Sequence, residues 1–165
     1  MSDPDTLSRE TFAADFPREL LTFFYPVHYK LGMEMEKAMG RGVLDRKQSA
    51  MLWLVFVKRN AEGWVPRKEI VRELSGWFEI SEAKVTRMLQ SLSAEPLELL
   101  TNVESPDSSR EKVLALTPAG DDFVQAMMAE AAEFMRQSLS HLSIAELEEG
   151  MRFFQKAFAP GRVPD

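Results

Sequence analysis

The sequence predicts a mainly α-helical chain with one small β-hairpin, in the order four helices, hairpin, two helices. Apolar residues recur with helical spacing along most of the 165 residues, and this periodicity is the primary signal of amphipathic helices. Two short segments of strand-like composition, LELL (97–100) and KVLAL (112–116), flank the turn-forming sequence ESPDSS and indicate the hairpin. Residues typical of helix starts stand before several of the periodic segments.

Three helices are expected before residue 80. The first should cover about 15–39, with Pro26 inside it, where a missing backbone donor should kink the helix. The second should begin after Asp45, a good N-cap, and run through MLWLVFV to about residue 60. The third should have Pro66 at its first position, where proline is favoured.

The fourth helix has the most informative pattern. Ser81 is a natural N-cap, and the apolar residues at i, i+3, i+4 and i+7 form one stripe: Val85, Met88, Leu89 and Leu92. At about 100° per residue, the opposite face is small, polar or cationic and has no acid: Ala83, Lys84, Arg87, Gln90 and Ser91. Such a face can approach a DNA major groove closely and bond base edges. The alternative is an ordinary amphipathic surface helix.

Two further helices should follow the hairpin. Thr117 is expected to cap the first, with Pro118 at its first position. Its apolar residues cover an arc of the helix surface that is wide enough to pack against two separate parts of the protein: Phe123, Val124, Met127, Met128, Ala131, Phe134 and Met135. The segment 143–146 (SIAE) is a capping box that opens the second helix. That helix carries a single apolar stripe: Ile144, Leu147, Met151, Phe154 and Phe158.

This order of elements predicts a winged helix-turn-helix with terminal dimerisation helices. Helices two to four and the hairpin, the wing, form the winged helix-turn-helix over residues 41–120. The segments 15–40 and 121–158 are the expected dimerisation helices of a single chain 15–165, and 1–14 is expected to be a flexible N-terminus. Strong apolar stripes without a partner domain in the chain indicate a homodimer. The alternative is that the terminal helices fold back on their own chain.

Charge is distributed unevenly along a chain whose net charge is −6. Residues 41–93 carry 10 basic and 6 acidic side chains, whereas 1–40 and 121–165 are both acidic overall. A basic middle between acidic ends suits a polyanionic partner better than the net charge does. The alternative is a charged surface that only faces water.

Composition excludes several classes of protein. The 45% hydrophobic content excludes general disorder, and no apolar run approaches the roughly 18 residues of a membrane span. The acidic, polar N-terminus is unlike a signal peptide, so a cytoplasmic protein is expected. The absence of cysteine excludes disulfides and thiol catalysis. His28 and His141 are the only imidazoles and no catalytic motif occurs, so no metal, cofactor or enzyme activity is expected.

Several features together resemble the MarR family of bacterial transcriptional regulators. They are AKVTRMLQSL (83–92), the hairpin ending in REKVLALTPAG (110–120), and the order and length of the flanking helices. The resemblance covers about 15–158. It implies an obligate homodimer whose winged domains each read half of a pseudo-palindromic operator in double-stranded DNA. It also implies a repressor that a small, often aromatic, ligand releases.

The resemblance also implies which residues contact DNA. They lie on the recognition helix, at the start of the preceding helix and on the wing, whose arginine enters the minor groove in the family: Arg67, Lys68, Lys84, Thr86, Arg87, Gln90, Ser91 and Arg110.

An aromatic group with a few polar tips is a candidate effector pocket, following the usual pattern of apolar walls and few polar groups: Phe24, Tyr25, His28, Tyr29 and Trp53. Packing in the core or at the dimer interface is the plainer interpretation of the same residues.

The sequence also fits a second class of function, in which the protein does not bind DNA. The acidic net charge and the glutamates of the wing, Glu104 and Glu111, favour a winged-helix dimer that binds a protein partner or a small ligand without binding DNA. The acid-free outer face of the fourth helix opposes it.

Overall fold

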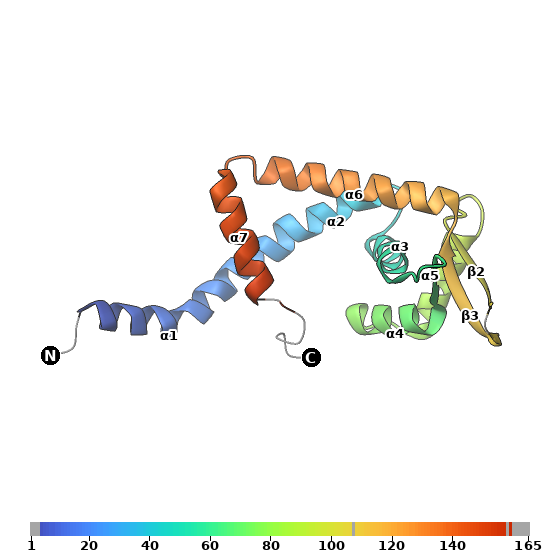
Figure 1. The fold of residues 1–165 in the computed structure, drawn as a ribbon, viewed down its shortest axis with the longest axis horizontal. Helices are drawn as coiled ribbons and strands as arrows, with labels where there is room; N and C mark the ends of the chain where they lie inside the picture. Colours follow the sequence, from blue (N-terminus) through green and yellow to red (C-terminus); the bar gives the residue numbers. More distant parts are fainter. Residues whose placement is uncertain (1–3, 107, 158, 160–165) are drawn as a thin grey trace. The chain divides into compact units, whose positions relative to one another are not determined.

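The computed structural model describes residues 4–106, 108–157 and 159, and the chain divides into two compact units, Met1–Ala131 and Ala132–Asp165. The boundary falls inside the helix α6 (Pro118–Ser138), so the first unit holds the strands that the structure describes, and the second holds the end of α6 and α7 (Ile144–Ala157). Figure 1 traces this order of elements. In the described part of the chain, none of the helices is long and apolar enough to cross a membrane.

The first predicted helix begins earlier than expected and is interrupted differently. α1 runs over Pro4–Tyr25, a π-helical segment follows over Pro26–Gly32, and α2 covers Met33–Gly40. The expected start near residue 15 is therefore wrong, and 4–14, expected to be flexible, are helical. Pro26 has no backbone N–H to give, and it stands at the first position of the wider π-turns, where a kink was expected.

α3 (Arg46–Lys58) confirms the predicted second helix and its cap. The Asp45 carboxylate accepts hydrogen bonds from the backbone N–H groups of Lys47 and Gln48, at 2.8 and 2.9 Å. The backbone N–H of Asp45 donates to the Gln48 side chain at 3.0 Å. This reciprocal box satisfies donors that the first turn of a helix leaves unpaired.

A short strand that was not predicted from the sequence precedes α4. Trp64–Pro66 forms β1, and α4 covers Arg67–Phe78. Pro66 is therefore the last residue of a strand and the N-cap of α4, and not the first helical residue. β1 pairs antiparallel with β3, in register Trp64↔Ala115, Val65↔Leu114 and Pro66↔Val113. The sheet consequently has three strands, in the order β1-β3-β2.

The hairpin forms, but its first strand lies further along the chain than predicted. β2 is Leu100–Ser105 and β3 is Ser108–Leu116, so the strands extend into most of the expected turn. Leu97 and Glu98 belong to a turn after α5 instead, because both of their backbone N–H groups donate to the carbonyl of Ala94 at 3.0 Å.

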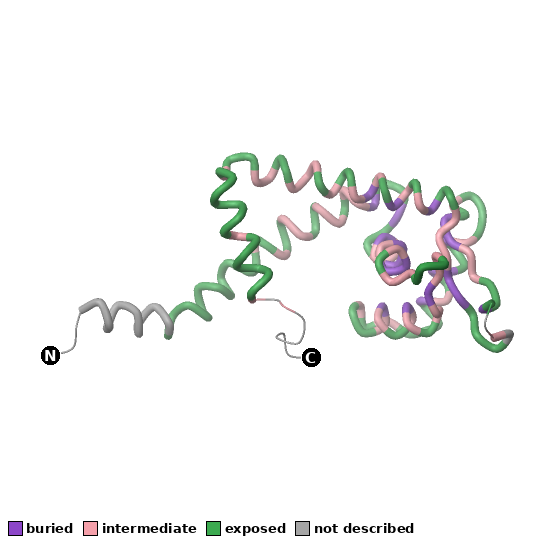
Figure 2. Tube along the Cα trace, in the orientation of Figure 1, coloured by how far each residue is buried: buried purple, intermediate pink, exposed green. Residues whose placement is uncertain are grey.

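α5 (Glu82–Ser93) matches the predicted fourth helix. The Ser81 hydroxyl caps it by accepting from the backbone N–H of Lys84, and its four buried residues are the predicted stripe. These side chains pack into a core with apolar residues of α3, α4, the sheet and the start of α6. Figure 2 shows that buried residues gather in this region.

The predicted Thr117–Pro118 sequence begins α6 and holds its first turn close to the sheet. The Thr117 hydroxyl donates to the carbonyl of Glu98 at 2.7 Å and accepts from the backbone N–H of Gly120 at 3.0 Å. A Cβ atom at position 120 would lie 2.0 Å from the carbonyl oxygen of Leu99. Glycine is therefore required for the helix to approach the sheet this closely.

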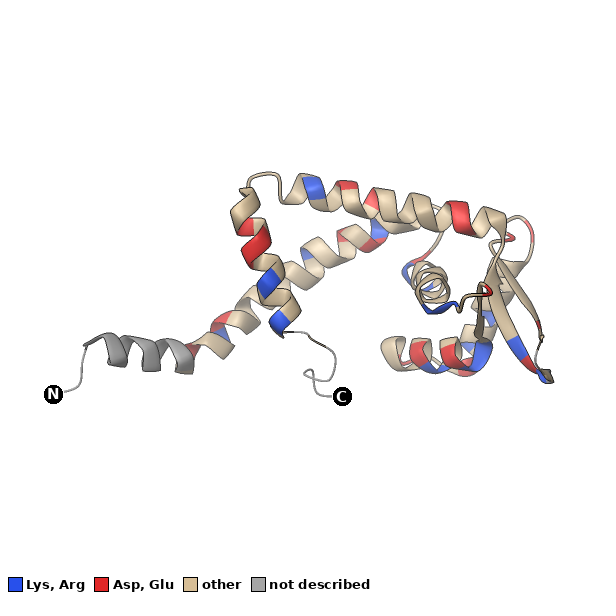
Figure 3. Ribbon diagram, in the orientation of Figure 1, with Lys and Arg blue, Asp and Glu red and all other residues tan. Residues whose placement is uncertain are grey.

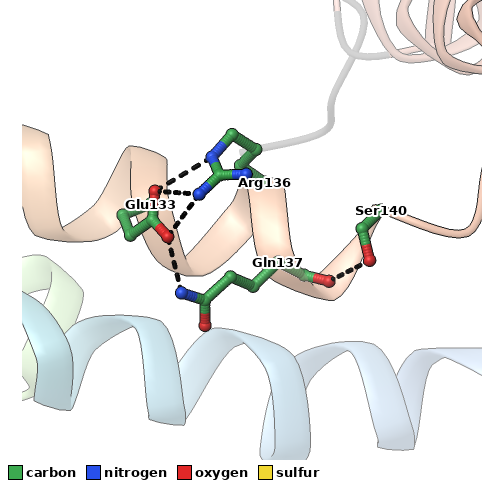
Figure 4. A network of polar contacts seen from close by, with 4 residues as sticks. All are labelled: Glu133, Arg136, Gln137 and Ser140. Carbon is green, nitrogen blue, oxygen red and sulfur yellow. Dashed lines mark hydrogen bonds and ion pairs between the residues drawn. The ribbon is translucent and has the colours of Figure 1, made fainter.

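In the second unit, a network of polar side chains lies along the last turns of α6 (Figure 4). Glu133 accepts from the guanidinium of Arg136 at 2.6–2.9 Å and from the side-chain amide of Gln137. Arg136 and then Gln137 hold the pKa of the Glu133 carboxyl below its usual value. The Ser140 hydroxyl donates to the carbonyl of Gln137 at 2.8 Å.

The predicted capping box opens α7. The backbone N–H and hydroxyl of Ser143 both donate to the Glu146 carboxylate, at 2.8 and 2.7 Å, and the pKa of Glu146 is lowered chiefly by these bonds. The apolar stripe of α7 is exposed along its described length (Figure 2). Phe158, the last member of the predicted stripe, lies outside the described residues.

Candidate nucleic-acid interface

The outer face of α5 carries the predicted base-reading residues. Lys84, Arg87 and Gln90 are exposed there, because the four apolar residues of the helix point into the core. Ser91 is also exposed, and its hydroxyl accepts from the side-chain amide of Gln48 at 3.3 Å. That bond ties α5 to the first turn of α3 and leaves Lys84, Arg87 and Gln90 as the long polar side chains facing outward.

Thr86 and Arg67 lie elsewhere on α5 and α4 and bond to each other. Both are half-buried, and Arg67 Nη2 donates to Thr86 Oγ1 at 2.8 Å. Arg67 Nε is buried and has no hydrogen-bond partner among the described residues. A buried donor without a partner costs free energy, so this guanidinium is only partly satisfied.

Lys68 and Arg110 reach the same region from α4 and from the wing (β2 and β3). Arg110 is exposed near the start of β3. Lys68 Nζ lies 2.5 Å from Glu111 Oε1, and both side chains are largely in water, 75% and 51% exposed. Figure 3 shows the alternation of basic and acidic residues along β3.

These elements enclose a hollow of about 610 Å³, which we call the cationic hollow. Its charged lining consists of five basic and two acidic side chains: Arg67, Lys68, Arg72, Arg110, Lys112, Glu82 and Glu111. Thr86 also lines it, whereas Lys84, Arg87, Gln90 and Ser91 do not. The predicted DNA-contacting residues therefore form two neighbouring sets, one on the outer face of α5 and one in the hollow.

Two basic residues of the hollow, Arg72 and Lys112, were not predicted. Arg72 could have been found from helical spacing, since it lies four residues after Lys68 and shares its face. Lys112 required the strand register. The pairing Pro66↔Val113 brings the start of α4 beside the middle of β3, and the sequence alone did not reveal β1.

The acids of α4 are held away from the hollow by a lysine of α3. Lys58 Nζ bonds to Glu69 at 2.9 Å and also to Glu73. These two carboxylates, Glu73 first, raise the pKa of Lys58 above its usual value. Neither acid lines the hollow, so the basic residues of α4 dominate its charge there.

The predicted aromatic group is brought together only in part. Phe24 stacks on His28 with ring centroids 5.3 Å apart, and Tyr25 and Tyr29 lie 4.8 Å apart. Trp53 instead stacks on Phe56, 6.0 Å away, and packs against the core. The first four residues thus line one stretch of helix, where Phe24, Tyr25 and Tyr29 are exposed.

A surface with this chemistry can bind a polyanion. Cations from α4 and β3 surround one concavity, and guanidinium groups form bidentate bonds with phosphate. The exposed Arg87 and Gln90 have the groups that bond base edges. In the described part of the chain, no cluster of three or more His, Asp or Glu residues could hold a metal ion.

Several solved structures are similar to this chain. A point mutant of MepR from S. aureus matches with a TM-score of 0.66 at 18% sequence identity, covering 84% of this chain and 95% of that chain. YusO from Bacillus subtilis matches with a TM-score of 0.59 at 21% identity, covering 97% and 100%.

Another S. aureus MepR mutant, bound to an oligodeoxyribonucleotide, matches with a TM-score of 0.57 at 16% identity, covering 85% and 96%. No protein-family model and no curated protein sequence matches the chain. At these identities the likeness shows the fold, and it confirms the predicted winged helix.

Proposed function

We propose that this chain, which has the winged-helix fold of MarR-family regulators, is a DNA-binding transcriptional regulator that acts as a homodimer. The observation that carries the proposal is the meeting of cations from α4 and β3 in one hollow beside the acid-free outer face of α5. Phosphate contacts from the hollow supply affinity, and base contacts from α5 supply sequence preference. The oligonucleotide bound to the similar MepR mutant supports the same proposal.

The roles of the individual residues follow from their positions. Arg67, Lys68 and Arg110 contact phosphates or the minor groove, and Lys84, Arg87 and Gln90 read bases. Thr86 positions the Arg67 guanidinium through its 2.8 Å hydrogen bond. Ser91, already bonded to Gln48, steadies α5 against α3 and contributes a small polar surface.

Fluorescence anisotropy with random-sequence duplex DNA tests the proposal. Each phosphate contact should add about 0.9 to the slope of log affinity against log salt concentration, so binding should weaken steeply between about 50 and 200 mM salt. Absence of binding at the lower salt concentration would contradict the proposal. That result would favour a winged-helix protein that binds another protein or a small ligand. The net charge of −6 and the Lys68–Glu111 pair, which occupies a lysine of the hollow, both disfavour binding of a polyanion and so fit that second function.

Base reading by α5 is tested by Arg87→Ala on a selected operator. This variant should lose roughly 1–3 kcal/mol and relax base preference at one position, whereas Arg110→Ala should weaken binding to all sequences similarly. Lys37→Ala is the matched control, because Lys37 is 79% exposed on α2, away from the hollow. Equal base preference in Arg87→Ala and in the wild type would refute the assignment.

The proposed regulator acts as a repressor, and a small aromatic ligand releases it from DNA. The stacked rings of Phe24 and His28 and the neighbouring Tyr25 and Tyr29 support it, since exposed rings with polar tips can hold a planar ligand. Titration of the protein–DNA complex with simple phenolic acids should release DNA, and Phe24→Ala should shift the titration to higher ligand concentration. Release at the same concentration from both proteins would remove these residues from the ligand site.

A further inference from the structure

The cationic hollow contains an acid that opposes its proposed use. Glu111 stands on β3 between Arg110 and Lys112, and its carboxylate holds Lys68 Nζ at 2.5 Å. All four residues line the hollow. A phosphate that binds Lys68 must therefore compete with Glu111 for the ammonium group and then lies next to a carboxylate.

The strand register explains why this pair forms. β1 and β3 run antiparallel, and their last pair is Pro66↔Val113. Lys68 follows Pro66 by two residues and Glu111 precedes Val113 by two, so the pair lies where the register would continue beyond the end of β1. The ion pair thus joins the first turn of α4 to the wing without replacing any backbone bond of the sheet.

We propose that Glu111 is a brake on nucleic-acid binding, which holds Lys68 and keeps the affinity of the hollow for phosphate low. This inference rests on the proposed function and names a residue that tunes it. Glu111 gives one of the two negative charges among the seven charged residues of the lining. Because both partners are largely exposed, the pair contributes little to folding stability, and its main effect is on what Lys68 can bind.

The brake has two separable parts. Repulsion between the Glu111 carboxylate and phosphate does not require Lys68, whereas occupation of Lys68 does. Neutralising Glu111 should remove both, and it should free one more lysine to release a counterion from DNA. The salt dependence of binding should then become steeper by about 0.9 in log–log slope.

Glu111→Gln tests the brake against Glu130→Gln, which makes the same change in net charge on an exposed residue of α6 outside the hollow. Binding of random duplex DNA at low salt should be roughly three- to tenfold tighter for Glu111→Gln and unchanged for Glu130→Gln. In a Lys68→Gln background the gain from Glu111→Gln should shrink, because only the repulsion remains to be removed.

The outcomes separate the brake from the function on which it rests. Equal affinities of Glu111→Gln, Glu130→Gln and the wild type, all with salt-sensitive binding, would overturn the brake and leave the proposed function standing. A gain from Glu111→Gln that is as large without Lys68 as with it would overturn the role of the Lys68 contact. If neither the wild type nor Glu111→Gln binds at low salt, both proposals fail.

Discussion

Single residues carry much of the specificity of this fold, and Gly120 is the clearest case. It lies in the sequence LTPAG, where the sequence suggested only a cap and a helix start. The structure adds the reason for the glycine, which is the carbonyl of Leu99 lying where a side chain would begin. That carbonyl also accepts from the backbone N–H of Thr117 at 3.1 Å, so it cannot move without a further loss.

Gly120→Ala is therefore expected to destabilise the protein, although alanine is ordinarily the better helix former. A Cβ atom 2.0 Å from the Leu99 oxygen must push α6 from the sheet, and overpacking of this kind costs about 1–3 kcal/mol or more. Gly76→Ala on α4 is the matched control, because a Cβ there meets nothing within 4 Å. It should be neutral or stabilising by up to about 1 kcal/mol. Thermal denaturation of both variants checks the prediction, and a similar melting temperature for the two would contradict it.

At the scale of elements, long amphipathic segments could be predicted from sequence and short or interrupted ones could not. The stripe of α5 matched its buried residues because four apolar side chains at helical spacing leave one face for the core. β1 was missed because three residues are too few to show alternation, and its pairing with β3 is fixed only by tertiary register. The start of α1 was missed because residues 4–14 lack a continuous apolar stripe.

The same distinction applies to the candidate site. Lys84, Arg87 and Gln90 follow from the helical wheel of α5, so sequence reasoning could find them. The cationic hollow depends on the pairing of β1 with β3, and the role of Glu111 depends on its contact with Lys68. Trp53 is the opposite case, because aromatic composition grouped it with Phe24 and its neighbours, whereas in the described structure it stacks on Phe56 and packs against the core.

The contact of α3 with α4 has a predictable dependence on pH. Lys58 bridges Glu69 and Glu73, and its folded-state pKa lies above the ordinary value of 10.5. A raised pKa means that the contribution of Lys58 to stability is complete below the unfolded pKa and is lost as pH rises through the folded pKa.

Lys58→Met should accordingly lower the melting temperature by a few degrees at neutral pH, because two carboxylates lose their cation. The difference from the wild type should shrink above about pH 10.5, as the wild-type lysine loses its charge. Lys37→Met, on a lysine that pairs with the exposed Glu34, is the control and should change little at any pH. A difference between the wild type and Lys58→Met that stays constant up to about pH 11.5 would contradict the linkage.

At the scale of the whole molecule, the apolar surface left exposed is the main evidence for assembly. On α7, Ile144, Met151 and Phe154 are 77%, 59% and 54% exposed. On α1, apolar side chains such as Leu21 and Phe23 are exposed as well. Several exposed apolar side chains along one helix are typical of an interaction site, and for the proposed regulator the partner is a second copy of the chain, because a pseudo-palindromic operator requires one.

A substitution on the exposed stripe of α7 tests this assembly. The wild type should elute with a mass near twice 18.8 kDa in size exclusion with light scattering. Met151→Glu together with Phe154→Glu should shift the mass toward the monomer, because charged groups in an apolar interface lose their hydration without gaining partners. The same pair should weaken operator binding, since one protomer contacts a single half-site. Gln155→Glu, on an exposed polar residue of the same helix, is the control and should remain a dimer. A wild type that is monomeric at the concentrations used for DNA binding would contradict the proposed assembly.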